Sequence, residues 1–117
     1  MTESQEQLQC ALVYPQAGKM DRLKEIMNQV IASVQEDEPN ALRYQVFLGS
    51  RPGGEPIMIV IEKYKDQTAL DQHRQGPQLV ELRRAAAEES LFARPPKSFL
   101  FPCSAKCMAV NGPKFGE

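Results

Sequence analysis

The apolar and polar positions of this chain follow two different periods in turn. Residues 7–14 alternate at every second position, which predicts a strand. Over 19–36 the apolar residues recur at helical spacing, which predicts an amphipathic helix that ends at an acidic turn. The segments 41–48 and 57–64 again have strand character and flank a loop rich in Gly and Pro, so they predict a hairpin.

The second half of the sequence predicts two short helices and a last strand. Asp66 is a suitable N-cap for a helix over 66–75, and the Gly-Pro pair that follows ends this helix and begins another over 78–91. Residues 97–101 predict a fourth strand. The order β-α-β-β-α-β, with the second helical region divided in two, is the ferredoxin-like α+β arrangement: an antiparallel four-stranded sheet with helices on one face.

The predicted strands place apolar residues on more surface than one layer of helices covers. In the second strand, one face is expected to hold Leu42, Tyr44, Val46 and Leu48. The third strand is apolar on both faces: its isoleucines lie opposite a face formed by Met58, Val60, Glu62 and Tyr64. The simplest cover for the second sheet face is another copy of the same sheet in a symmetric homodimer. The alternative is that the C-terminal tail folds across it.

Length and composition indicate one folded domain. The chain has 117 residues, and its 42% hydrophobic and 25% charged residues are ordinary for a soluble globular protein. We expect a single domain over 1–117, with its core over about 7–102 and a weakly patterned tail over 103–117. The net charge of −1, without a block of Lys and Arg, argues against nucleic acid as a partner.

The apolar runs and the cysteines indicate a cytoplasmic protein. The longest apolar run, 57–61, is far shorter than the about 20 residues of a membrane span, and the N-terminus does not resemble a signal peptide. The odd number of cysteines suits a reducing compartment. Cys103 and Cys107 are too few ligands for zinc, because the only histidine is His73, far away in the sequence. We therefore expect no metal.

Two segments carry motifs of fixed spacing. The first, 38–44, reads EPNALRY, and the second, 62–73, reads EKYKDQTALDQH. Both resemble the antibiotic biosynthesis monooxygenase family, whose members carry E-P-G-x-L-x-Y into the second strand and E-x-Y-x-D-x-x-A-L-x-x-H from the third strand into a helix. Asn40 stands where the family usually has Gly, and Asn also tolerates a left-handed turn.

The resemblance implies a dimeric α+β barrel, in which two sheets pack face to face and each protomer holds a cavity between its sheet and its helices. Several members of the family oxidise anthrones, hydroquinones or similar phenols with O2 and without a metal or flavin. Others in the superfamily cyclise, isomerise, decarboxylate or dehydrochlorinate small molecules, so the fold alone does not define the reaction.

His73 and Glu62 are the candidate catalytic residues. On its helix, His73 shares a face with Ala69 and Leu70, so it should point toward the sheet. A partly buried imidazole there could remove a phenolic proton, or it could simply tie the helix to a strand. Glu62 interrupts an apolar strand and could pair with His73 or Arg43, or reach solvent at the strand end.

The candidate substrate-binding residues are two tyrosines, an arginine and two apolar residues. Tyr44 and Tyr64 could stack on a planar phenol and donate a hydrogen bond to it, or act as half-buried packing residues. Arg43 could stabilise a phenolate, or form an outward salt bridge. Met58 and Val60 could line an apolar pocket or belong to the core.

The leading hypothesis from the sequence is a cofactor-independent monooxygenase of secondary metabolism. It would act with O2 on an electron-rich phenolic or quinol-type molecule, with His73 as a base oriented by Glu62. One alternative is a cyclase, isomerase or lyase that acts on a polyketide-like molecule with the same fold. Another is a dimeric binding protein without catalytic activity.

Overall fold

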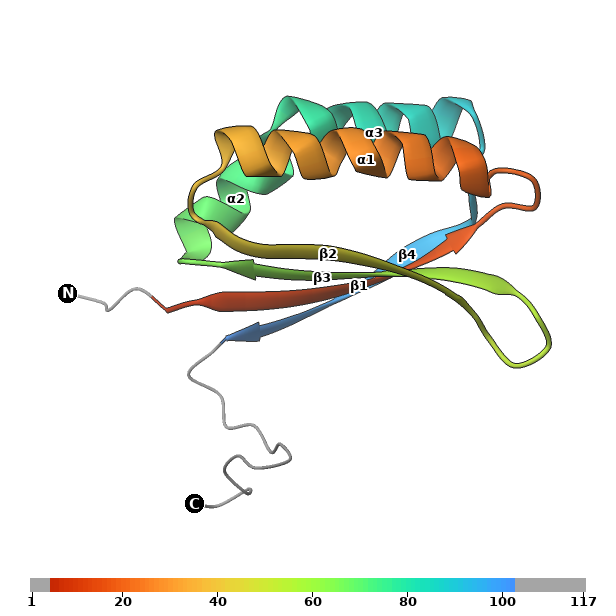
Figure 1. The fold of residues 1–117 in the computed structure, drawn as a ribbon, viewed down its shortest axis with the longest axis horizontal. Coiled ribbons are helices and arrows are strands. Elements are labelled where there is room, and N and C mark those ends of the chain that lie inside the picture. The colour runs from red at the N-terminus through yellow and green to blue at the C-terminus, as the bar shows by residue number, and fades with distance from the viewer. Residues whose placement is uncertain (1–4, 103–117) are drawn as a thin grey trace, which may run out of the picture.

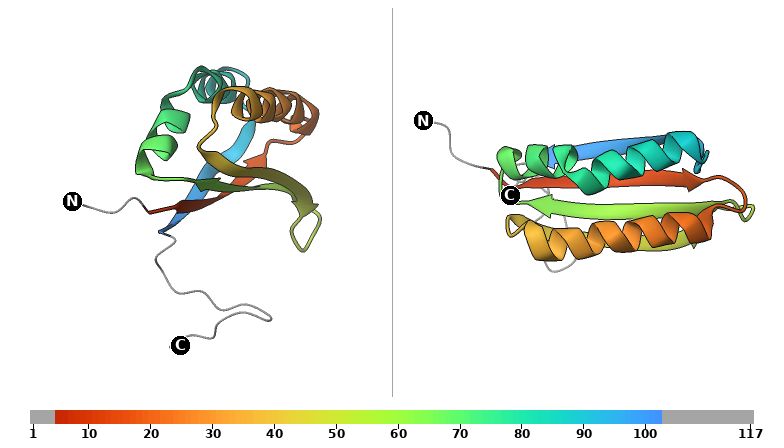
Figure 2. Two further views of the ribbon diagram at one scale, coloured as in Figure 1. Left: turned by 60° about the vertical axis from the view of Figure 1, so that its left-hand side comes forward. Right: turned by 90° about the horizontal axis from the view of Figure 1, so that it is seen from above.

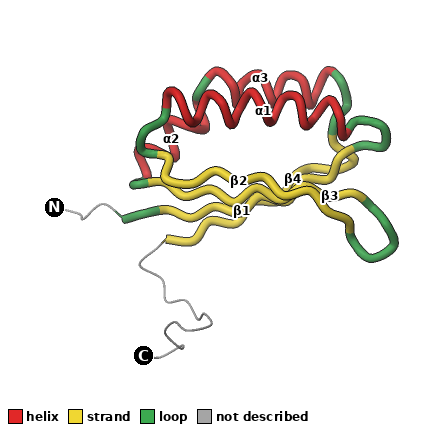
Figure 3. The backbone as a smooth tube through the Cα atoms, in the orientation of Figure 1, coloured by secondary structure: helices red, strands yellow, loops and turns green. Residues whose placement is uncertain are grey.

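The structure, a computed structural model, describes residues 5–102. Its elements are, in order, β1 (Gln7–Pro15), α1 (Met20–Asp37), β2 (Ala41–Ser50), β3 (Pro56–Tyr64), α2 (Gln67–Gln75), α3 (Pro77–Glu88) and β4 (Phe92–Pro102). The strands form one antiparallel sheet in the order β2-β3-β1-β4, and the helices lie over one of its faces (Figures 1 and 3). This confirms the ferredoxin-like α+β fold predicted from the sequence. None of the described helices is both long and apolar enough to cross a membrane.

The main core lies between α1 and the sheet. The apolar positions of α1 recur at helical spacing, so one side of the helix is buried against the strands. That side consists of Leu23, Ile26, Met27, Val30 and Val34. Figure 2 shows α1 on the β2 side of the sheet and α3 toward β1 and β4. The space between α1 and the edge strand β2 therefore lies at the side of the molecule.

Helix α2 is short and depends on local signals at both ends. Its N-cap is Asp66, whose Oδ1 accepts a hydrogen bond from the Ala69 amide at 2.8 Å, as the sequence predicted. At the other end, the Gly76 amide donates to the His73 carbonyl at 3.1 Å. Pro77 then begins α3, where its missing amide hydrogen has no cost in the first turn. These caps define where α2 begins and ends, and with it the place of His73.

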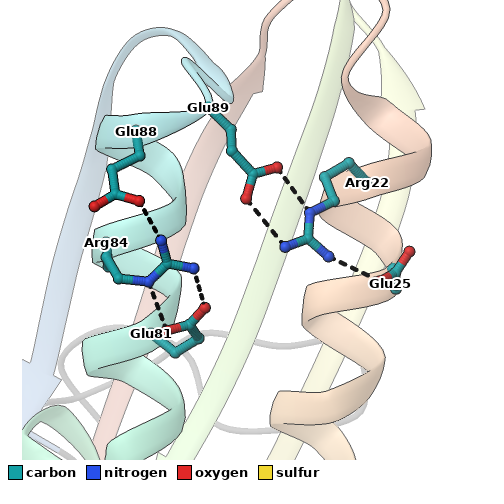
Figure 4. Close-up of polar contacts among 6 residues, drawn as sticks. All are labelled: Arg22, Glu25, Glu81, Arg84, Glu88 and Glu89. Carbon is teal, nitrogen blue, oxygen red and sulfur yellow. Dashed lines mark hydrogen bonds and ion pairs between the residues drawn. The ribbon is translucent and has the colours of Figure 1, made fainter.

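Ion pairs join the outer surfaces of the helices (Figure 4). Arg22 of α1 donates to both oxygens of Glu89, at 2.9 and 3.0 Å, and to Glu25 at 2.8 Å. On α3, Arg84 bonds with Glu81 and Glu88. The pair between Arg22 and Glu89 connects the N-terminal turn of α1 to the residue that follows α3, so it holds the two long helices side by side.

The last strand is longer than the sequence predicted. The structure begins β4 at Phe92 and ends α3 at Glu88, whereas the sequence suggested a helix to 91 and a strand only from 97. The added part of the strand contains two prolines, Pro95 and Pro96. They are tolerated because β4 is an edge strand, paired only with β1, and its register is irregular near this point.

A bulge at the start of β2 changes which residues face the helices. Ala41 pairs with Tyr64, but a register shift follows before the next pair. Ala41 therefore packs against the core, and Leu42 is 49% exposed. The expectation that Leu42 shares a face with Tyr44 is wrong, because the extra residue of the bulge reverses the alternation at that point.

The sheet face away from the helices is apolar, and no helix or loop within residues 5–102 covers it. Cross-strand rows on this face include Phe47 beside Ile59 and Leu12, and Ile61 beside Cys10 and Phe99. Phe47, Phe99 and Phe101 are each almost half exposed. The residues that could form a tail across this face, 103–117, lie outside the described residues, so the structure does not test that alternative.

Candidate active site

His73 lies between two carboxylates. Its side chain is 2% exposed and points from α2 toward the sheet. Its Nδ1 is 2.8 Å from Oε1 of Glu38, in the turn between α1 and β2, and its Nε2 is 3.7 Å from Oε1 of Glu62 on β3. An imidazole in this position can exchange a proton with the near carboxylate.

Glu62 is buried, and each of its carboxylate oxygens accepts a hydrogen bond. The Tyr64 hydroxyl donates to its Oε1 at 2.5 Å, and Gln9 Nε2 donates to its Oε2 at 3.1 Å. Gln9 in turn accepts a hydrogen bond from the guanidinium of Arg74 at 2.5 Å. Such a chain offsets the cost of burying a carboxylate and fixes its orientation toward His73.

The rings of Tyr44 and Tyr64 flank His73, and each ring centroid is 5.3 Å from the centroid of the imidazole. Burial, and then the negative charge of Glu62, raise the pKa of both hydroxyls well above the usual range. Both therefore stay protonated and can donate. The Tyr64 hydroxyl donates to Glu62, whereas the Tyr44 hydroxyl has no hydrogen-bond partner within residues 5–102.

Glu38 connects this buried cluster with open space. Its side chain is 24% exposed, against 2% for His73. It borders a groove of about 330 Å³ between the C-terminal half of α1 and the start of β2, which we name the head groove. This groove is lined by residues that include Ile31, Val34, Gln35, Glu38, Leu42 and Tyr44. A molecule in the head groove would meet Glu38 and Tyr44, with His73 behind them.

A second groove of about 310 Å³ lies on the other side of the turn over 38–41, toward the junction of α2 and α3. Its lining includes Ser33, Asp37, Asn40, Gln72 and Pro77, together with Glu38. Both grooves contain apolar side chains, but Tyr44 lines the head groove and not the second groove, so the head groove is the better candidate for an aromatic molecule.

The structure brings together four of the seven residues that the sequence singled out. His73, Glu62, Tyr44 and Tyr64 form one cluster. Arg43 does not pair with Glu62: it follows the bulge, lies beside Lys63, and its Nε donates to Gln45 at 2.5 Å on the exposed side of β2.

Arg43 nevertheless belongs to the lining of the head groove. Val60 is 3% exposed and packs in the core. Met58 is fully buried and borders a smaller groove farther along β2.

Three residues of the cluster were not candidates in the sequence analysis. Glu38 was present there as the first residue of a motif, but the acidic turn around it resembles an ordinary helix end. Gln9 lies on β1 and was counted among the polar positions of an alternating strand. Its burial could have been inferred from its row, because Gln9, Glu62 and Tyr44 are cross-strand neighbours on the helix side. Nothing in the sequence around Arg74 indicated that it belongs to the cluster.

No group of three or more His, Cys, Asp or Glu side chains in residues 5–102 is arranged to hold a metal ion. Cys103 and Cys107 lie outside the described residues. The chemistry that the described cluster can perform by itself is proton transfer between Glu38, His73 and a molecule in the head groove, with hydrogen-bond donation by Tyr44.

Comparison with solved structures finds several proteins with a similar fold. Rv0793 from Mycobacterium tuberculosis is similar with a TM-score of 0.71 at 20% identity, over 90% of this chain and 98% of that chain. A conserved protein from Methanosarcina mazei Go1 is similar with a TM-score of 0.72 at 16% identity, over 85% and 93%. PA3566 from Pseudomonas aeruginosa has a TM-score of 0.67 at 19% identity, over 87% and 96%. At these identities the likeness shows the fold alone.

The sequence itself defines the family. The antibiotic biosynthesis monooxygenase family matches residues 8–85, about two thirds of the chain. The chain therefore belongs to this family, as the two motifs indicated. A search of curated proteins finds no match.

Proposed function

We propose that this protein is a cofactor-independent monooxygenase that oxidises an electron-rich phenolic or quinol-type small molecule with O2. Its place would be in secondary metabolism in the cytoplasm. The observation that carries the proposal is the position of Glu38, which links the buried His73 to the head groove that Tyr44 also lines. Family membership supports the same class of reaction.

The first step is removal of the phenolic proton. The substrate hydroxyl gives its proton to the pair formed by Glu38 and His73, whose Oε1 and Nδ1 atoms lie 2.8 Å apart. Glu62, on the Nε2 side, stabilises the imidazolium that results. The Tyr44 hydroxyl, protonated because burial raises its pKa, donates to the phenolate oxygen.

The phenolate is then the reductant. It gives one electron to O2, and the substrate radical and superoxide combine at carbon to form a peroxide anion, which takes back the proton held by Glu38 and His73 and becomes a hydroperoxide. For a substrate in which a CH2 group is activated by the phenol, loss of water leaves a ketone. One oxygen atom of O2 is then in the product and the other is in water. Ile31, Val34 and Leu42 in the lining of the head groove would cover the apolar part of the substrate.

Oxygen consumption with anthrone or methylhydroquinone tests this proposal. We expect Glu38→Gln and His73→Gln each to lower the rate by about a hundredfold, the usual size of a lost acid–base group. Glu36→Gln is the matched control, because it removes an exposed carboxylate two residues away on α1. Unchanged oxygen consumption in His73→Gln would overturn the assignment of the base, and no oxygen consumption above the uncatalysed rate in the unaltered protein would overturn the reaction.

The same proton relay favours a second candidate, an isomerase or cyclase that acts on a polyketide-like substrate. The cluster contains proton-transfer groups and a hydrogen-bond donor, which such reactions need as much as an oxidation does. Strict anaerobic conditions separate the two functions: turnover of the substrate without O2 supports the isomerase or cyclase. Saturable binding without turnover under either condition would support a binding protein.

We also propose that the protein forms a homodimer through the uncovered sheet face. Phe47, Phe99 and Phe101 stay almost half exposed on a face with few charges, which is more apolar surface than a monomer usually presents. Phe99→Glu would then convert the dimer to a monomer in light scattering coupled to gel filtration. Val80→Glu is the control, since Val80 is equally exposed but lies on α3. A monomeric unaltered protein would refute this proposal.

A further inference from the structure

A third groove, also between α1 and β2, adjoins the head groove at Ile31. This arm groove, of about 220 Å³, is lined by residues that include Lys24, Met27, Ile31, Val46, Leu48 and Met58. Ile31 borders both grooves. Because α1 and β2 run antiparallel along the side of the molecule, the head groove lies at the end of α1 and the arm groove lies toward its beginning (Figure 1).

The two grooves differ in chemistry. Glu38 and Tyr44 line the head groove, and the Tyr44 hydroxyl has no hydrogen-bond partner within residues 5–102, so the groove suits a group that gives up a proton and accepts a hydrogen bond. The arm groove has a floor of Met58, Val46 and Leu48 and a side formed by Met27, and methionines adapt to apolar groups of varied shape. Lys24 stands at its end near solvent.

The spacing along β2 gives the length of the combined site. Tyr44 and Leu48 lie on the same face of the strand, and four residues at about 3.4 Å each separate them by roughly 14 Å. A single phenol ring fills only the part next to Tyr44. The arm groove remains for a substituent that extends from the ring past Ile31.

We propose that the substrate is an elongated, amphipathic phenol: its oxidisable ring lies in the head groove, and an apolar arm passes Ile31 into the arm groove. This inference rests on the proposed function for the role of the head groove. Each methylene of the arm that leaves water would strengthen binding by up to about fourfold. An arm of several carbons therefore raises affinity strongly although it is remote from the reacting atoms.

Binding of two probes by isothermal titration calorimetry under nitrogen tests the proposal. The probes are methylhydroquinone, which has only a head, and hexylhydroquinone, which adds an apolar arm. We expect the unaltered protein to bind hexylhydroquinone at least tenfold more tightly. Leu48→Trp, at a residue that lines the arm groove and not the head groove, should fill the arm groove and remove most of this advantage, while the affinity for methylhydroquinone stays within about twofold.

Matched controls separate blockage from damage to the fold. Ala32→Trp places the same side chain on the exposed side of α1 and should leave both affinities unchanged. Leu48 is exposed on an edge strand, so the larger side chain there should leave the fold intact. Ile31→Trp, at the residue that borders both grooves, should weaken the binding of both probes. Equal affinity of the two probes for the unaltered protein, or an equal preference in Leu48→Trp and Ala32→Trp, would overturn the inference.

The binding readout is independent of turnover. If the arm strengthens binding and Leu48→Trp removes that effect while no oxygen is consumed, the substrate class stands and the oxidation is wrong. If oxygen is consumed equally well with both probes and both bind equally, the oxidation stands and the elongated substrate is wrong.

Discussion

Tyr44 and Tyr64 form a natural pair for testing the site. Both rings lie 5.3 Å from the His73 ring, and for both hydroxyls burial raises the pKa. They differ in one respect: the Tyr64 hydroxyl donates to buried Glu62 at 2.5 Å, and the Tyr44 hydroxyl has no partner among the described residues. Replacement of each by Phe removes one oxygen atom and leaves the ring in place.

The expected effects on stability follow from this difference. Tyr64→Phe leaves a carboxylate oxygen of Glu62 without its closest donor, and a buried hydrogen bond to a charged group contributes about 1.5–3 kcal/mol. For a domain of this size, the loss corresponds to a Tm roughly 10 °C lower. Tyr44→Phe should change the free energy of unfolding by less than about 0.5 kcal/mol. Oxygen consumption should show the opposite order if Tyr44 donates to the phenolate, with a loss of about tenfold or more in Tyr44→Phe.

Urea unfolding followed by circular dichroism measures the first effect, and its pH dependence adds a second readout. Because the folded pKa of each tyrosine lies above that of the unfolded chain, the stability that they contribute is present below about pH 10 and is lost as pH rises. Above about pH 10, each tyrosine that stays protonated in the folded state lowers the free energy of unfolding by about 1.4 kcal/mol per pH unit. Either Phe variant should reduce this slope. Equal destabilisation by Tyr64→Phe and Tyr44→Phe at neutral pH would refute the hydrogen-bond assignment.

Three further predictions concern the scaffold around the site. Asp66→Ala removes the N-cap of α2 and should lower the free energy of unfolding by about 0.5–2 kcal/mol in urea titrations, whereas Asp66→Asn should retain most of it. Met58→Ala leaves a cavity beneath α1 and should cost about 2–5 kcal/mol in the same assay; a smaller loss would mean that the groove beside it collapses. The hydrogen bond from Arg22 lowers the pKa of Glu89, so the stability from this pair is full above about pH 4.3 and is lost as pH falls through the lowered value. The Tm of Glu89→Gln should therefore lie below that of the unaltered protein at neutral pH and converge with it in acid; a constant difference would contradict the ion pair.

Much of the fold was predictable because hydrophobic period and cap residues act locally. The amphipathic period of α1 and the Asp66 cap of α2 each depend on residues close together in the sequence. The strand over 92–96 was not predictable in this way, because its two prolines are acceptable only at a sheet edge, and edge position is a property of the whole sheet.

From the sequence, a site residue could be predicted only where its type is unusual for its position. Glu62 in an apolar strand and a lone His73 on the buried side of a helix are such residues. Glu38 lies in an acidic turn, where one more carboxylate is unremarkable, and it becomes distinctive only when α2 brings His73 to within 2.8 Å. Contacts between residues 35 positions apart depend on packing, so they cannot be inferred from local pattern.

The bulge at Ala41 also bears on how such a site could diverge during evolution. It separates two anchor points: Glu38 belongs to the turn after α1, while Tyr44 is held by its pairing with β3. Insertion or loss of one residue within the bulge would change the spacing between the carboxylate and the phenol ring without disturbing the register of the remaining strand. Substrate preference could thus drift through changes in loop length alone, on a sheet that stays the same.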